Sequence, residues 1–184
     1  MFTELLKAIA LALDRAGVPY MIFGAQAVLL YGEPRITRDI DVTLGVGPDQ
    51  PGPVLAVISE MGLRVLVDDP KEFLEQTFVL PAQDASGVRI DFVFSLSQFE
   101  QQAIARARIV PLDGVEVRFV SMEDLIVQKI VAGRPRDLDD AKNVIRKNPG
   151  FDRAFVEDWL GQFDQELDTD ALRSFRQVVE ELRD

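Results

Sequence analysis

The first residues of the chain place their apolar side chains first at helical spacing and then in an unbroken run. Apolar residues recur every three or four positions over residues 3–16, which predicts a helix that stops near Gly17. The segment VPYMIF (18–23) predicts a buried strand that ends at Gly24, and a short apolar helix over 25–32 follows. Because a glycine here joins a strand to a helix N-terminus, this passage can form a phosphate site.

Predicted strands and helices alternate through the middle of the chain. We expect strands over 37–44, 63–67, 77–82 and 88–94, and helices over 54–61, 70–76 and 96–107. Residues 108–120 predict a β-hairpin, because Asp113-Gly114 is a favoured two-residue turn. This alternation favours an α/β fold.

The residues beyond 120 follow a helical pattern. Ser121 and Asp124 have the spacing of a helix start, and we expect helices over 122–132, 136–147, 152–163 and 170–183. The expected fold is therefore a mixed α/β (α+β) class, in which helices flank a mixed twisted sheet and a C-terminal helical extension follows. We expect residues 1–120 to form the core and residues 121–184 to pack on it as part of one structural unit.

Three aspartates stand out against this apolar background. Asp39 and Asp41 are two positions apart in a predicted strand, so they share a face while Ile40 enters the core. Asp91 lies in the apolar segment RIDFVF (89–94), where an isolated carboxylate is costly and needs a partner or a metal. Carboxylate oxygens favour Mg²⁺ or Mn²⁺, so the three acids predict a magnesium site.

Composition restricts the chemistry further. The 184 residues contain no Cys and no His, which excludes Cys nucleophiles, imidazole bases, His-bound zinc and disulfides. The formal net charge of −11 repels nucleic acid at long range and makes it a less favoured partner. The longest uncharged run, residues 16–32, is too short for a membrane helix, and charged residues interrupt the N-terminal apolar pattern of a secretory signal. A cytoplasmic location is expected.

The order of these features resembles the motif of the DNA polymerase β-type nucleotidyltransferase superfamily. That motif has a glycine, then a DxD pair and then a later acid, which here are Gly24, Asp39 with Asp41, and Asp91. The segment GAQAVLLYGEPRITRDIDVTL (24–44) is more specifically similar to the AbiEii-type toxin branch. The segment SMEDLIVQKIVAGRPRDLDDAKNVI (121–145) extends that similarity with a Lys-bearing helix followed by an Arg-Asp helix. The resemblance implies a nucleotidyltransferase-like fold.

It also implies roles for particular residues. Asp39, Asp41 and Asp91 would be catalytic metal ligands, and Asp91 would also accept the proton of the attacking hydroxyl. Gly24 and Ala25 would contribute backbone groups to a phosphate site. The superfamily usually has Gly or Ser after the first glycine, so Ala25 lacks a hydroxyl donor.

Other residues are candidates for nucleotide binding. Lys129 falls within the apolar stripe of its predicted helix. Its ammonium group either extends to water, or it points at the triphosphate or balances the charge of the aspartate cluster. Asp137 and Asp140 share a face of the next helix, and Asp137 is also explained by its place near the helix start. We include Asp140 in the nucleotide site. Beside the DxD, Thr37 is favoured over Arg38, although both border the site.

The leading hypothesis is a Mg²⁺-dependent (or Mn²⁺-dependent) enzyme that transfers a nucleoside monophosphate from a triphosphate to a hydroxyl acceptor. The acceptor can be tRNA, a protein or a small molecule, and the toxin resemblance implies an antitoxin protein as partner. The alternative is a noncatalytic relative that keeps the fold and binds a nucleotide or a partner protein without turnover. Ala25 is the main support for that alternative.

Overall fold

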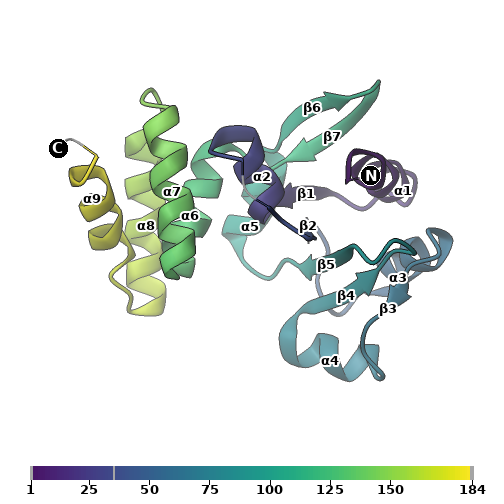
Figure 1. Cartoon of the computed structure of the whole chain (residues 1–184). Coiled ribbons are helices and arrows are strands. Elements are labelled where there is room, and N and C mark those ends of the chain that lie inside the picture. The colour runs from purple at the N-terminus through teal and green to yellow at the C-terminus, as the bar shows by residue number, and fades with distance from the viewer. Residues whose placement is uncertain (1, 35, 183–184) are drawn as a thin grey trace. The chain divides into compact units, whose positions relative to one another are not determined.

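The computed structural model describes residues 2–34 and 36–182. These residues form two compact units (Figure 1). The first unit contains residues 2–26 and 36–120, and the second contains residues 27–34 and 121–182. We call them the sheet unit and the helical unit. The expected packing of residues 121–184 on the core stays a prediction.

The sheet unit is built from elements whose order matches the sequence pattern. The helices are α1 (Phe2–Arg15), the first turn of α2 (Gly24–Tyr31), α3 (Gly52–Glu60), α4 (Pro70–Thr77) and α5 (Gln98–Ala105). The strands are β1 (Tyr20–Phe23), β2 (Asp39–Leu44), β3 (Arg64–Val65), β4 (Val79–Gln83), β5 (Arg89–Phe94), β6 (Arg108–Leu112) and β7 (Val115–Phe119). The β6–β7 hairpin turns at Asp113 and Gly114, both with positive φ, as the sequence predicted.

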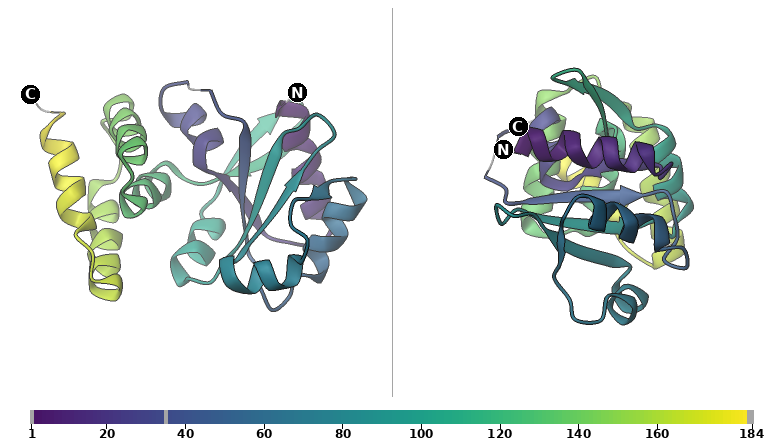
Figure 2. Two further views of the ribbon diagram at one scale, coloured as in Figure 1. Left: turned by 60° about the horizontal axis from the view of Figure 1, so that its bottom comes forward. Right: turned by 90° about the vertical axis from the view of Figure 1, so that its right-hand side faces the viewer.

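The described strands form a seven-stranded mixed sheet in the order β3-β4-β5-β2-β1-β7-β6. The strands are labelled in Figure 1, and Figure 2 shows the ribbon from two further sides. The central strands β5 and β2 run parallel, and β1 runs antiparallel to β2. Helix α1 packs on β7 and α3, α4 packs on β4, and α5 packs on β2. The predicted mixed α/β fold is therefore confirmed.

Alternation of side chains along β2 and β5 separates the core from the opposite face. Ile40, Val42, Ile90 and Phe92 are all fully buried, whereas the acids between them are not. This is the two-residue period of a strand with one apolar face. The core of the sheet unit thus fixes which face the acids occupy.

Helices α6 (Met122–Ala132), α7 (Pro135–Lys147), α8 (Arg153–Leu167) and α9 (Ala171–Glu180) build most of the helical unit. Helix α6 packs on α7, α8 and α9. The later part of α2 joins them, because Asn148 donates to the carbonyl of Tyr31 at 2.8 Å and Lys147 to that of Gly32 at 3.0 Å. Side-chain caps at Ser121 and Asp152 start α6 and α8.

Several predicted boundaries differ from the structure. Strand β2 begins at Asp39, so Thr37 and Arg38 precede it, and β3 has only two residues instead of five. Helix α8 continues four residues beyond its predicted end, to Leu167. The predicted end of the last helix at residue 183 lies outside the described residues. Among the residues that are described, no helix is both long and apolar enough to cross a membrane.

Candidate functional site

The register of β2 and β5 brings the predicted acids to one face of the sheet. Asp41 pairs with Asp91 and Asp39 pairs with Arg89 in the parallel ladder. Paired residues on neighbouring strands project to the same side, and residues two apart on one strand do likewise. Asp39, Asp41, Arg89 and Asp91 therefore occupy adjacent positions of a single face, where neighbouring strands are about 4.8 Å apart.

Exposure differs among the three carboxylates. Asp39, the first residue of β2, is exposed, and Asp41 is partly buried. The side chain of Asp91 is 19% exposed. Asp91 is thus not sealed within the core as its apolar neighbours suggested, because it projects from the face opposite to Ile90 and Phe92. A carboxylate in this position can reach a bound ligand and still be partly shielded from water.

Gly24 lies directly against the Asp41 carboxylate. It follows Phe23, which pairs with Asp41 across the β1–β2 ladder. Its φ is +62°, and a Cβ at this position would lie 2.0 Å from Asp41 Oδ2. Only glycine tolerates both the left-handed backbone and this approach. The first turn of α2 therefore begins beside the carboxylate.

Two further residues of α2 complete this turn. Ala25 is buried and supplies no side-chain donor, as the sequence indicated. The amide nitrogen Nε2 of Gln26 is buried without a hydrogen-bond partner in the part of the chain that the structure describes. A helix N-terminus leaves its first backbone N–H groups free to donate, so the donors that this turn can offer a ligand come from the main chain.

Arg89 is the residue of this face that the sequence interpretation missed. Its Nε donates a hydrogen bond of 2.8 Å to Oδ1 of Asp91. That bond, together with the charges of Asp91, Asp39 and Asp41, raises the pKa of Arg89 above its usual value. The signal in the sequence was the two-residue spacing of Arg89 and Asp91, which places them on the same face of a strand.

The site residues have the ligand type that a hard divalent cation needs. Three carboxylates share the face, and the absence of a Cβ at Gly24 lets the Asp41 carboxylate lie directly against its backbone. Within residues 2–34 and 36–182, however, no three acidic side chains are gathered closely enough to hold a metal ion. The carboxylates fit magnesium in chemistry, while one oxygen of Asp91 is engaged by Arg89.

Residues that precede β2 are arranged more loosely. Thr37 Oγ1 is within 3.3 Å of the carbonyl oxygen of Asp39 and 3.5 Å of its N–H, so its hydroxyl contacts the main chain at the start of the strand. Arg38 is exposed. Arg35, which belongs to the quoted motif, lies outside the described residues. Roles of Thr37 and Arg38 in nucleotide binding stay predictions.

Lys129 belongs to the helical unit, where two carboxylates hold its ammonium group. Nζ lies 2.7 Å from Asp137 Oδ1 and 2.9 Å from Asp140 Oδ2. The side chain of Lys129 is only 9% exposed, so its head does not reach bulk water. Lys129 therefore lies on the buried face of α6, as its spacing indicated, and the partners of its ammonium group are the two acids of the following helix.

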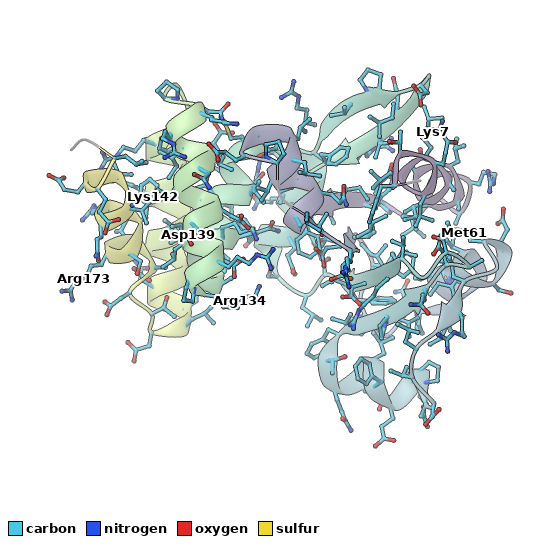
Figure 3. The ribbon with its side chains drawn as sticks, viewed as in Figure 1. Lys7, Met61, Arg134, Asp139, Lys142 and Arg173 are labelled. Atoms are coloured by element: carbon cyan, nitrogen blue, oxygen red, sulfur yellow. The ribbon has the colours of Figure 1, made fainter. Side chains whose placement is uncertain are left out.

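The turn between α6 and α7 makes this cluster possible. Gly133 ends α6 with a φ of +64°, and Pro135 begins α7. The reversal sets Lys129 against the first turns of α7. Arg134, labelled in Figure 3, adds a second cation by donating from Nε to Asp137 Oδ2.

Asp137 accepts hydrogen bonds from two cations of this group. Burial alone would raise its pKa, but hydrogen bonds from Lys129 and Arg134 outweigh that effect and lower the pKa of Asp137. The cluster is a buried network of ion pairs in the helical unit. Nucleotide contacts by Lys129 and Asp140 stay predictions.

Comparison with known proteins identifies the family. A family model described as "Nucleotidyltransferase of unknown function (DUF6036)" matches residues 1–148. This chain belongs to that nucleotidyltransferase family. The match includes Gly24, the aspartates of β2 and β5, and the Lys129 cluster. A search of curated proteins found no match.

Solved structures share the nucleotidyltransferase fold at low sequence identity. The antibiotic-resistance factor ANT(2″)-Ia in complex with adenylyl-2″-tobramycin is 19% identical, with a TM-score of 0.59 over 89% of this chain and 97% of the other. Its solution structure gives a TM-score of 0.58 at 19% identity, over 89% and 91% of the two chains. An antigenic nucleotidyltransferase-like protein from Paracoccidioides brasiliensis is 16% identical, with a TM-score of 0.57 over 94% and 92%. These likenesses show the fold.

Proposed function

We propose that this nucleotidyltransferase transfers a nucleoside monophosphate from a triphosphate to a hydroxyl acceptor in a Mg²⁺-dependent reaction. The observation that carries the proposal is the single face formed by Asp39, Asp41 and Asp91, with Gly24 packed against Asp41. Mn²⁺ has the same ligand preference and is the natural substitute. Membership of the family supports the reaction class.

Each residue of the face has a distinct task in this proposal. Asp39 and Asp41 would hold the metal that carries the triphosphate, and Asp91 would complete the ligand set. When bound, the divalent cation supplies positive charge that stabilises the phosphoryl oxygens. Backbone N–H groups at the start of α2 would donate to phosphate, and the Asp41 carboxylate, which lies against Gly24, would hold the metal beside that turn.

The transfer step uses Asp91 as the proton acceptor. The acceptor hydroxyl oxygen forms a bond to the α-phosphorus, and the bond from that phosphorus to the bridging oxygen of pyrophosphate breaks. The hydroxyl proton moves to a carboxylate oxygen of Asp91, and pyrophosphate leaves with the electron pair of the broken bond. Partial exposure of Asp91 makes such an encounter with an acceptor feasible.

The charge of the protein favours some acceptors over others. A net charge of −11 opposes unassisted binding of tRNA and is compatible with a small molecule or a protein hydroxyl. The structure of ANT(2″)-Ia with adenylyl-2″-tobramycin contains an adenylylated small molecule, which supports placing small molecules in an acceptor panel. We propose a cytoplasmic reaction, where nucleoside triphosphates are abundant.

The similarity of residues 24–44 to AbiEii-type toxins supports a finer proposal. The protein would act as the toxin of a toxin-antitoxin pair, and a partner protein would neutralise it. Controlled expression should then slow growth, and co-expression of a neighbouring gene product should restore it. Normal growth during expression of the wild type, in cells where the transferase reaction is detected in extracts, contradicts the toxin role alone.

The direct test is incubation with each of four α-labelled triphosphates, Mg²⁺ or Mn²⁺, and a panel of tRNA, protein and small hydroxyl acceptors. Transfer of label and release of pyrophosphate are expected for the wild type and not for Asp41→Asn. Asp139→Asn, which changes an exposed carboxylate on α7 labelled in Figure 3, is the matched control and should stay active. Label transfer that survives Asp41→Asn unchanged would refute the assignment.

A noncatalytic nucleotide-binding module is the second candidate. Ala25 removes a side-chain donor from the phosphate turn, and Arg89 engages Asp91. This candidate predicts calorimetric binding of a triphosphate with no pyrophosphate released across the whole panel. Any turnover that depends on Asp41 excludes it.

A further inference from the structure

We propose that Arg89 is an internal competitor for the metal site, holding Asp91 in the free protein and releasing it only when metal and triphosphate bind together. This inference rests on the proposed function, and it concerns how the site is assembled. It assigns Arg89 as a positioning residue that acts through Asp91.

The first support is the contact itself. Arg89 Nε and Asp91 Oδ1 are 2.8 Å apart, which is a charge-assisted hydrogen bond. A carboxylate oxygen that accepts this bond has less capacity to coordinate a cation. The bond must therefore lengthen or break before Oδ1 of Asp91 can become a ligand.

The second support is the position of Arg89 among the acids. It pairs with Asp39 across the ladder, next to the Asp41–Asp91 pair, so these four neighbouring positions carry three negative charges and one positive charge. A divalent cation placed between these carboxylates would lie beside the guanidinium and be repelled by it. Arg89 thus weakens metal binding both by occupying an oxygen and by its charge.

The third support is the freedom of the Arg89 side chain. It is 48% exposed, whereas that of Asp91 is 19% exposed, so the guanidinium can move away while the carboxylate stays. Its planar group of donors matches phosphate oxygens as well as a carboxylate. An arriving triphosphate therefore offers Arg89 a replacement partner, which couples nucleotide binding to metal binding.

The sheet provides a matched control for this arginine. Arg64 on β3 pairs with Gln83, and Gln83 pairs with Arg89, so both arginines lie in one row on the same face. Arg64 bonds to the neutral side chain of Gln83 at 2.7 Å. Arg64→Gln and Arg89→Gln remove the same charge from the same face, but only the second releases Asp91.

The test is Mn²⁺ binding to the 184-residue protein without nucleotide, measured by electron paramagnetic resonance of free Mn²⁺. A neighbouring charge of opposite sign, in hydrogen-bond contact with a carboxylate, changes the affinity of that carboxylate for a proton by about tenfold or more. We take the same factor for its affinity for a cation. We expect Arg89→Gln to bind Mn²⁺ about tenfold more tightly than wild type, and Arg64→Gln to stay within about twofold of wild type. Adding a nonhydrolysable triphosphate should tighten Mn²⁺ binding in the wild type more than in Arg89→Gln.

The outcomes separate this inference from the proposed function. Equal or weaker Mn²⁺ binding by Arg89→Gln, with binding still lost in Asp41→Asn, overturns the role of Arg89 and leaves the metal site intact. No Mn²⁺ binding by any variant, with or without triphosphate, overturns both. If Arg89 had only a structural role, Arg89→Gln would bind Mn²⁺ more weakly than wild type. Thermal unfolding of each variant serves as the control that the variant is folded.

Discussion

Gly24 and Asp41 are in such close contact that a methyl group on the glycine would lie 2.0 Å from the carboxylate oxygen Oδ2. Strands β1 and β2 pair antiparallel, and the contact joins the end of β1 to the second acid of β2. It fixes the place of the Asp41 carboxylate relative to the first turn of α2. The consequences of disturbing it can be measured.

Gly24→Ala should damage the site more than its backbone strain alone explains. A left-handed conformation costs a residue with a Cβ about 1–2 kcal/mol. The same cost applies to Gly17→Ala, since Gly17 has a φ of +65° but nothing within 4 Å of the place that a methyl group would occupy. In urea unfolding, the free energy of unfolding should fall more for Gly24→Ala than for Gly17→Ala. Triphosphate binding should be lost in Gly24→Ala and kept in Gly17→Ala. Equal behaviour of the two variants would show that the contact with Asp41 is unimportant.

Asp91→Asn should reduce turnover strongly. Asparagine keeps the size of the side chain but accepts no proton, and loss of a positioned base costs about 10²–10⁴-fold in rate. Initial rates of pyrophosphate release measure the effect at saturating triphosphate. Asp139→Asn serves as the control, and a loss of less than about tenfold would argue against Asp91 as the base.

Lys129→Met should destabilise the protein severely. The substitution leaves Asp137 and Asp140 buried without their shared cation, and breaking a buried ion pair costs about 3–5 kcal/mol. Lys142, labelled in Figure 3, pairs with Glu181 at a partly exposed position, so Lys142→Met should cost at most about 1 kcal/mol. The free energy of unfolding in urea compares them. A similar small loss for both would contradict a stabilising role for the Lys129 cluster.

Stability should fall in acid partly through Asp137. Its pKa in the folded protein is below the ordinary value of 3.8, so the unfolded chain binds a proton more readily. The stabilisation is present above the unfolded pKa and is lost as the pH falls through the folded pKa. Between about pH 5 and pH 2 the unfolding free energy of the wild type should therefore decline more steeply than that of Asp137→Asn. Parallel declines would show that Asp137 does not contribute.

Much of the architecture could be predicted because each element carries its own local pattern. The apolar alternation around Ile40 and Ile90 determines which face of β2 and β5 is buried, and the acids follow on the other face. The turn at Asp113 needs positive φ, which its sequence signals directly. These features depend on neighbours within a few residues.

Other features depend on contacts between distant parts of the chain. The parallel pairing of Asp41 with Asp91 spans fifty positions, and its register is set by the packed sheet. Arg89 lies only two positions from its partner Asp91, but its place beside Asp39 depends on the same strand pairing. Assignment of residues 27–34 to the helical unit likewise depends on a tertiary contact, in which Asn148 bonds to the carbonyl of Tyr31.

The ion network of Lys129, Asp137 and Asp140 also bears on how this family can diverge. Because loss of Lys129 removes the cation that the two buried aspartates share, its single replacement should be selected against, whereas simultaneous replacement of all three by apolar residues would be tolerated. Relatives should therefore keep the whole trio or lack it together, and the three positions should covary when homologous sequences are aligned.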